Sequence, residues 1–164
     1  MFNKILVALD DSIHHRTVFA AAFALAQQTN AHLMLLHVLS TNEPIELTLP
    51  VFSGYYPTLS EDLVRQCHEE QRAIEERGLQ RLQSLADEAT AAGVPVEFTQ
   101  KMGVPGPLIC TIAKDWGADL IMVGRRGQSG LSELLLGSVS NHVLHHAPCA
   151  VLVIQPQVKE TEET

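Results

Sequence analysis

The residues with the clearest chemical potential lie between Gly124 and Ser140. There the chain reads Gly-Arg-Arg-Gly, then nine residues, then Gly-Ser-Val-Ser. Glycine has no Cβ, so main-chain N–H groups beside it can approach an anionic oxygen, and a helix starting near Ser138 would add the unpaired N–H groups of its first turn. This pattern predicts a phosphate site, with a nucleotide as the ligand. The alternative is an ordinary strand-to-helix connection that needs positive φ angles, and it stays open.

A carboxylate is the second group that a nucleotide would use. Asp10 follows a short apolar run and is itself followed by Asp11 and Ser12. If the strand that ends at Asp10 lies beside the strand that ends at Gly124, the Asp10 carboxylate can accept hydrogen bonds from both ribose hydroxyls. Capping of the next helix is the alternative for Asp10 and Ser12, and the two roles are compatible.

Two further groups of side chains are candidates for charge or metal chemistry. Arg125 and Arg126 lie inside the glycine segment, where they would either pair with a phosphate oxygen or remain solvated. His142, His145 and His146 have the i, i+3, i+4 spacing of one helix face. No carboxylate or cysteine stands at an obvious partner spacing, so we do not expect a metal ion there.

The elements that must position these groups follow from the apolar pattern. Short apolar runs predict buried strands over residues 5–9, 33–39, 94–99, 120–123 and 150–154. Segments of helical spacing between them predict helices over residues 12–30, 60–93, 106–117 and 138–146, with Ser12 as the N-cap of the first. One face of the second helix is expected to hold Ile74, Gly78, Leu82, Leu85 and Ala89.

This alternation of strand and helix predicts an α/β fold. It would be a doubly wound parallel sheet, Rossmann-like, with helices on both faces and one domain over residues 1–156. Residues 40–59 contain three prolines and predict a long irregular loop, which is either a lid or partner surface or simply mobile. The polar, acidic residues 157–164 predict a disordered tail.

Composition narrows the class of partner. The net charge of -8, from 11 Lys and Arg against 19 Asp and Glu, leaves no basic patch for nucleic acid. The three cysteines have no C-x-x-C spacing, so we expect neither a disulfide framework nor a zinc site. No apolar stretch has the length of a membrane span and the N-terminus has no signal-like core, so we expect a cytoplasmic protein without membrane insertion.

Several motifs together resemble the universal stress protein family. They are the run ILVALDDS at 5–12, LHV at 36–38, GADLIMVG at 117–124, the G-x2-G-x9-G-S frame, and PCAVLVI at 148–154. The resemblance covers residues 1 to about 156, and the glycine frame is that of the ATP-binding branch. It implies a five-stranded sheet in the order 3-2-1-4-5.

The resemblance also implies a set of nucleotide-binding residues. In the family, the first-strand aspartate holds ribose, the main chain at the end of the second strand meets adenine, and the glycine frame holds the triphosphate, often with Mg²⁺ or Mn²⁺. Carried over by position, the set is Ala8, Asp10, Val38, Val123, Gly124, Arg126, Gly127, Gly137, Ser138, Val139 and Ser140. Ala8 stands where some members have proline, and Arg125 where many have a small residue. Both departures bear on affinity or phosphate preference.

The last strand bears on assembly. Residues 150–154 carry no charge or proline, which is unusual for an edge strand left in water. The resemblance implies a homodimer formed by antiparallel pairing of this strand with its copy. The interface residues would be Val151, Leu152, Val153 and Ile154.

The expected function is that of an ATP-binding sensor or regulator in the stress response. The chain has no Walker motif and no G-x-G-x-x-G, so we expect hydrolysis to be slow or absent. Three alternatives remain: a binder of AMP or cyclic AMP, a dimeric protein-protein regulator that works without nucleotide, and a slow ATPase.

Overall fold

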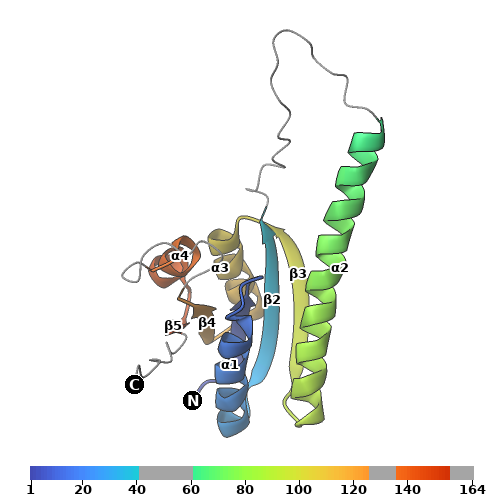
Figure 1. Ribbon diagram of the computed structural model, residues 1–164. Coiled ribbons are helices and arrows are strands. Elements are labelled where there is room, and N and C mark those ends of the chain that lie inside the picture. Colours follow the sequence, from blue (N-terminus) through green and yellow to red (C-terminus); the bar gives the residue numbers. More distant parts are fainter. Residues whose placement is uncertain (41–60, 126–135, 156–164) are drawn as a thin grey trace, which may run out of the picture.

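The computed structural model describes residues 1–40, 61–125 and 136–155. Nine elements follow one another in these ranges: β1 (Lys4–Leu9), α1 (His15–Thr29), β2 (His32–Ser40), α2 (Glu61–Ala91), β3 (Val96–Gly103), α3 (Pro105–Trp116), β4 (Leu120–Gly124), α4 (Ser138–His146) and β5 (Ala150–Ile154). They form one five-stranded parallel sheet in the order β3-β2-β1-β4-β5 (Figure 1). The predicted α/β class and strand order are confirmed.

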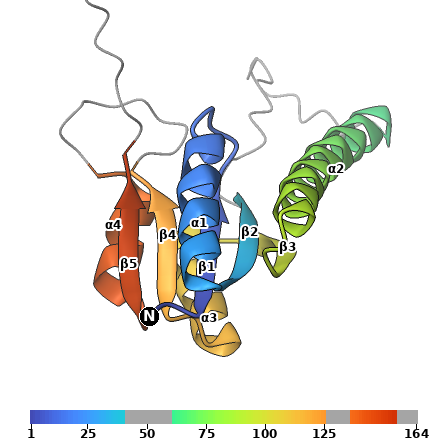
Figure 2. The same cartoon turned by 90° about the horizontal axis from the view of Figure 1, so that it is seen from below.

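Helices cover both faces of the sheet. In Figure 2, α1 and α2 lie on one side of the strands and α3 and α4 on the other. Odd-numbered residues of β1 such as Ile5 and Val7 pack with α1 and α2, while Leu6 packs with α3 and α4. Because β1 is buried on both faces, its run of apolar residues lacks the alternation of a half-exposed strand.

The strand register brings three strand ends together. Leu9 of β1 pairs with His37 of β2, and Ala8 pairs with Val123 of β4. The carboxyl ends of these strands therefore lie side by side at one edge of the sheet. The connections leave β1 and β4 toward opposite sides of the sheet order, so this edge is the point where the winding reverses.

The C-terminal ends of α1 and α3 have the capping residues that local chemistry favours, but the predicted start of α1 is wrong. Asn30 closes α1 and Gly117 closes α3, both with positive φ, as expected for left-handed C-caps. The predicted N-cap Ser12 is wrong, because α1 begins at His15 after His14. The Ser12 hydroxyl instead accepts a bond from the main-chain N–H of His14 at 3.3 Å, in the turn that precedes the helix.

The expected apolar face of α2 is only partly buried. Leu82, Leu85 and Ala89 have at most 2% of their surface exposed, whereas Ile74 is 45% exposed. In Figure 1 the first turns of α2 rise past the ends of the strands, so the N-terminal end of the helix has no sheet to pack on.

Six strand boundaries differ from the predicted ones, and the largest shifts are at the two ends of β3. Val94 does not belong to β3, because its N–H closes α2 by bonding to Ala89 O at 3.0 Å. β3 continues to Gly103, and β2 continues through Ser40, because the two strands pair along their whole length. The rest of the predicted loop at 40–59 and the predicted tail at 157–164 lie outside the described residues.

Candidate functional site

The first turn of α4 supplies main-chain donors at the edge where the winding reverses. Gly137 is the N-cap of α4 with extended backbone angles, and no side chain of the described residues caps the helix. The first helical bond runs from Asn141 N–H to Gly137 O at 2.8 Å. Within the described ranges, the N–H groups of Ser138, Val139 and Ser140 have no acceptor. Three donors at the positive end of a helix form an arrangement that suits a phosphate.

Not every predicted donor of the glycine frame is free. Gly137 N–H donates to Arg125 O at 2.9 Å, and Arg125 N–H donates to Ile154 O at 2.8 Å. The Ser140 side chain is 3% exposed, and its hydroxyl donates to Gly124 O. These bonds join the start of α4 to the ends of β4 and β5. The Gly137 N–H and the Ser140 hydroxyl therefore hold the chain in place and are not free to bind a ligand.

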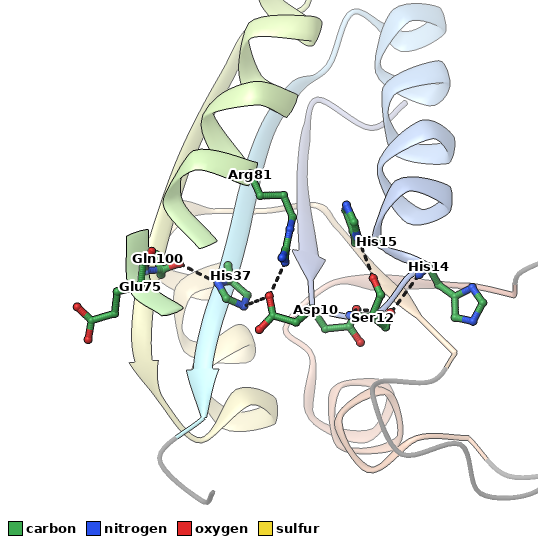
Figure 3. Close-up of polar contacts among 9 residues, drawn as sticks. Asp10, Ser12, His14, His15, His37, Glu75, Arg81 and Gln100 are labelled. Atoms are coloured by element: carbon green, nitrogen blue, oxygen red, sulfur yellow. Dashed lines mark hydrogen bonds and ion pairs between the residues drawn. The ribbon is translucent and has the colours of Figure 1, made fainter. Parts of the chain in front are cut away.

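Asp10 lies just beyond β1 and forms a turn. Its Oδ1 accepts bonds from the Ser12 N–H at 3.1 Å and from the Ser12 hydroxyl at 2.6 Å (Figure 3). No bond to Oδ2 is found among the described residues. Asp10 is half-buried, so one oxygen fixes the turn while the other can accept a hydrogen bond from a ligand.

The apolar members of the predicted set lie on the α3 and α4 side of the sheet. Ala8, Val38 and Val139 are partly buried against the core cluster on that side. Val123 is only 2% exposed, so any contact it makes with a ligand would be through its main chain. Arg126 and Gly127 lie outside the described residues.

A buried polar cluster lies directly behind these residues, on the α1 and α2 side. His37 of β2 is 4% exposed, and its two ring nitrogens face different partners. Nδ1 bonds Gln100 Oε1 at 2.8 Å, and Nε2 lies 3.4 Å from Oδ1 of Asp11. Arg81 of α2 donates to the same Asp11 oxygen. Figure 3 shows His37, Gln100 and Arg81 converging between β2 and α2.

Sequence reasoning missed this cluster. One signal was available, because His37 is the one polar residue in the run Leu33–Val38, and a polar group inside a buried strand needs a partner. Its partners are Gln100 of β3, 63 positions later in the chain, and Asp11, 26 positions earlier. No local pattern identifies partners at such distances.

Other candidate groups form no site in the described part of the chain. The rings of His142 and His146 stack with centroids 4.2 Å apart, and His146 Nδ1 bonds His142 O. No group of three metal-ligating side chains comes together in residues 1–40, 61–125 and 136–155. No helix described here has an apolar stretch long enough to cross a bilayer.

Comparison with known proteins identifies a family for this chain. Residues 1–155 match the sequence profile of the universal stress protein family. Universal stress protein Sll1388 of Synechocystis is 38% identical over 154 residues, which cover 94% of this chain and 98% of that protein.

Solved structures give the same fold. A universal stress protein family protein of Arabidopsis thaliana with AMP bound superposes with a TM-score of 0.64 at 23% identity, covering 97% of this chain and 95% of that one. A universal stress protein in complex with cAMP gives 0.60 at 24% identity, covering 94% and 97%. At this level of identity the likeness concerns the fold.

Proposed function

The chain belongs to the universal stress protein family, and from this premise we propose that it binds an adenine nucleotide, ATP in particular, and acts as a nucleotide-dependent regulator. The observation that carries the proposal is the juxtaposition, at one sheet edge, of the Asp10 carboxylate with three N–H groups, from Ser138 to Ser140, that have no acceptor among the described residues. Two relatives of the same fold are described with AMP or cAMP bound.

Each group has a role that its chemistry suits. The N–H groups of the first turn of α4 would hold phosphate oxygens, and Oδ2 of Asp10 would accept from the ribose hydroxyls. The main chain at Val38 would meet the adenine. The sequence carries the whole G-x2-G-x9-G-S frame, which in the family holds a triphosphate, and this favours ATP. Mg²⁺ or Mn²⁺ would accompany the nucleotide and take its ligands mostly from phosphate and water.

Binding alone is enough for regulation. A ligand that binds only the folded form stabilises it by about 2.7 kcal/mol at a hundredfold excess over its Kd. Such a gain can select one conformation or assembly without hydrolysis, and we propose that turnover is slow or absent.

A second candidate ligand is a monophosphate, either AMP or cAMP. It is favoured by the bonds that already use Gly137 N–H and the Ser140 hydroxyl, because they leave fewer donors for three phosphates. Acid extraction of the purified protein and mass spectrometry of the extract would identify any co-purified nucleotide and separate the two candidates.

The phosphate site is tested by one exposed position with a matched pair of variants. In Ser138→Asp, the carboxylate would repel phosphate but stabilise the first turn of α4 by about 0.3–1 kcal/mol through the helix dipole. We expect an unchanged or higher Tm without nucleotide and loss of the ATP-induced rise in Tm. Ser138→Asn, which has similar size but no charge, should keep that rise. An equal ATP-induced rise in both variants would contradict binding at α4.

A further inference from the structure

A glycine, Gly78, lets α2 pack closely against the buried polar cluster. Glu75, Gly78 and Arg81 follow one face of the helix at intervals of three. A Cβ on Gly78 would collide with Gln100 Oε1 and would lie 2.8 Å from His37 Nδ1. Only a residue without a side chain lets the α2 backbone approach His37 and Gln100 this closely.

The hydrogen bonds in this cluster have a fixed direction. Gln100 Nε2 donates to the main-chain oxygen of Glu75 at 3.0 Å. Its Oε1 therefore faces His37 and accepts from the Nδ1–H group. Nε2 of His37 is left to face the Asp11 carboxylate, which also accepts from Arg81. The cluster thus runs from α2 through β3 and β2 to the end of β1 and returns to α2.

Two of its members are immediate neighbours of proposed nucleotide-binding residues. Asp11 follows Asp10, and His37 precedes Val38. Successive residues of a strand point to opposite faces of the sheet, so His37 packs on the α2 side while Val38 packs with α3 and α4. Holding Asp11 and His37 against α2 consequently fixes the main chain on which Asp10 and Val38 stand.

We propose that Asp11, His37 and Arg81 are positioning residues of the nucleotide site. They set the orientation of Asp10 toward ribose and of the Val38 main chain toward adenine, without touching the ligand. This inference rests on the proposed function. It assigns ribose recognition to a contact between α2 and the strand ends, in addition to the glycine frame.

The test measures Kd for ATP and for 2′-deoxy-ATP by calorimetry in the presence of Mg²⁺. The variants are Asp11→Asn, at a side chain about one-third exposed, and His37→Asn, which keeps a donor toward Gln100 but loses the contact with Asp11. The control is Glu88→Gln, which breaks the exposed ion pair between Arg16 and Glu88, another link between α1 and α2, outside the cluster. Thermal unfolding without nucleotide accompanies each variant.

Wild type should prefer ATP to 2′-deoxy-ATP. In Asp11→Asn and His37→Asn the Kd for ATP should rise about tenfold, as expected for one misplaced hydrogen bond, and the preference should shrink toward unity. Glu88→Gln should match wild type. A general loss of stability would instead raise the Kd values for ATP and 2′-deoxy-ATP by the same factor.

Three results would overturn the inference. They are an unchanged Kd and preference in Asp11→Asn, a parallel loss for both nucleotides, or a wild type without preference between them. The Asp11→Asn result stands by itself if the buried His37→Asn change prevents folding. A wild-type protein that binds neither nucleotide would instead refute the proposed function, and the positioning role with it.

Discussion

The thiol of Cys149 has surroundings that act on its pKa in one direction. Burial raises the pKa of Cys149, and the nearby Asp119 and Cys110 raise it further; burial also raises the pKa of Cys110. Because the thiolate is the reactive form, both cysteines should react slowly with iodoacetamide near neutral pH. They are therefore poor candidates for redox chemistry.

The raised pKa of Cys149 predicts a loss of stability in alkali. The unfolded chain loses the thiol proton near pH 9, while the folded chain retains it to higher pH. Stability from this group is present below about pH 9 and is lost as the pH rises above it. Cys149→Ala should flatten the fall of the unfolding free energy above about pH 9, measured by urea titration. Cys67→Ala, on α2, is the control, and an equal fall in wild type and Cys149→Ala would refute the prediction.

The sequence was informative for residues whose chemistry is local. The positions of Asp10 at a strand end and Ser138 at a helix start follow from the adjacent apolar pattern and glycines, and the structure has both at those boundaries. The bond of the Ser140 hydroxyl to Gly124 O was not predictable, because a hydroxyl in a first helical turn can face either a ligand or the chain. The partners of His37 could not be predicted either, because periodicity indicates which face of an element is buried but not which residues pack against that face.

At the scale of elements, the close packing of α2 at Gly78 predicts a change in stability opposite in sign to the usual effect of replacing glycine in a helix. Ala in place of Gly inside a helix normally stabilises by roughly 0.5–1 kcal/mol. Gly78→Ala should instead destabilise by about 1–2 kcal/mol, because the added methyl meets Gln100 and His37 in a packed contact. Chemical denaturation would measure the change in unfolding free energy.

Two further variants separate the clash from helix propensity. Ser84→Ala, at an exposed position of α2, should be neutral or slightly stabilising. Adding Gln100→Ala to Gly78→Ala removes the side chain that the new methyl contacts. The double variant should therefore lose less unfolding free energy than the sum of the losses in the two single variants. Additive losses would mean that Gly78 is not required for the close approach.

Most elements could be predicted because their ends carry clear signals. α4 and β5 have the predicted bounds, and positive-φ Asn30 and Gly117 end α1 and α3. The misplaced start of α1 arose because Ser12 caps a turn rather than the helix. The exposed Ile74 was missed because the amphipathic pattern of α2 continues beyond the sheet that it covers.

At the scale of the whole molecule, β5 is a sheet edge that bears on assembly. Within residues 1–40, 61–125 and 136–155, β5 pairs only with β4, and Leu152 is 42% exposed. We propose that a second copy covers this edge through antiparallel pairing of Val151–Ile154, since an uncharged apolar edge invites pairing.

Leu152→Lys should therefore yield a monomer with little change in its far-UV circular dichroism, because the side chain is exposed within one copy. Sedimentation equilibrium would give the mass. Leu79→Lys, at a 43% exposed leucine of α2, should leave the dimer intact. The proposed interface would be refuted by a wild type that sediments as a monomer or by a Leu152→Lys protein that remains dimeric.

The N-terminal end of α2 extends beyond the sheet, so a small rotation of the helix would move this end by a larger distance. The 31 residues of α2 span about 46 Å, and Glu61 lies 17 positions, or about 25 Å, before Gly78. A rotation of about 10° at Gly78 would swing the first turn by about 4 Å. A spin label placed on that turn would therefore amplify a movement at the strand ends that is too small to be seen where it originates.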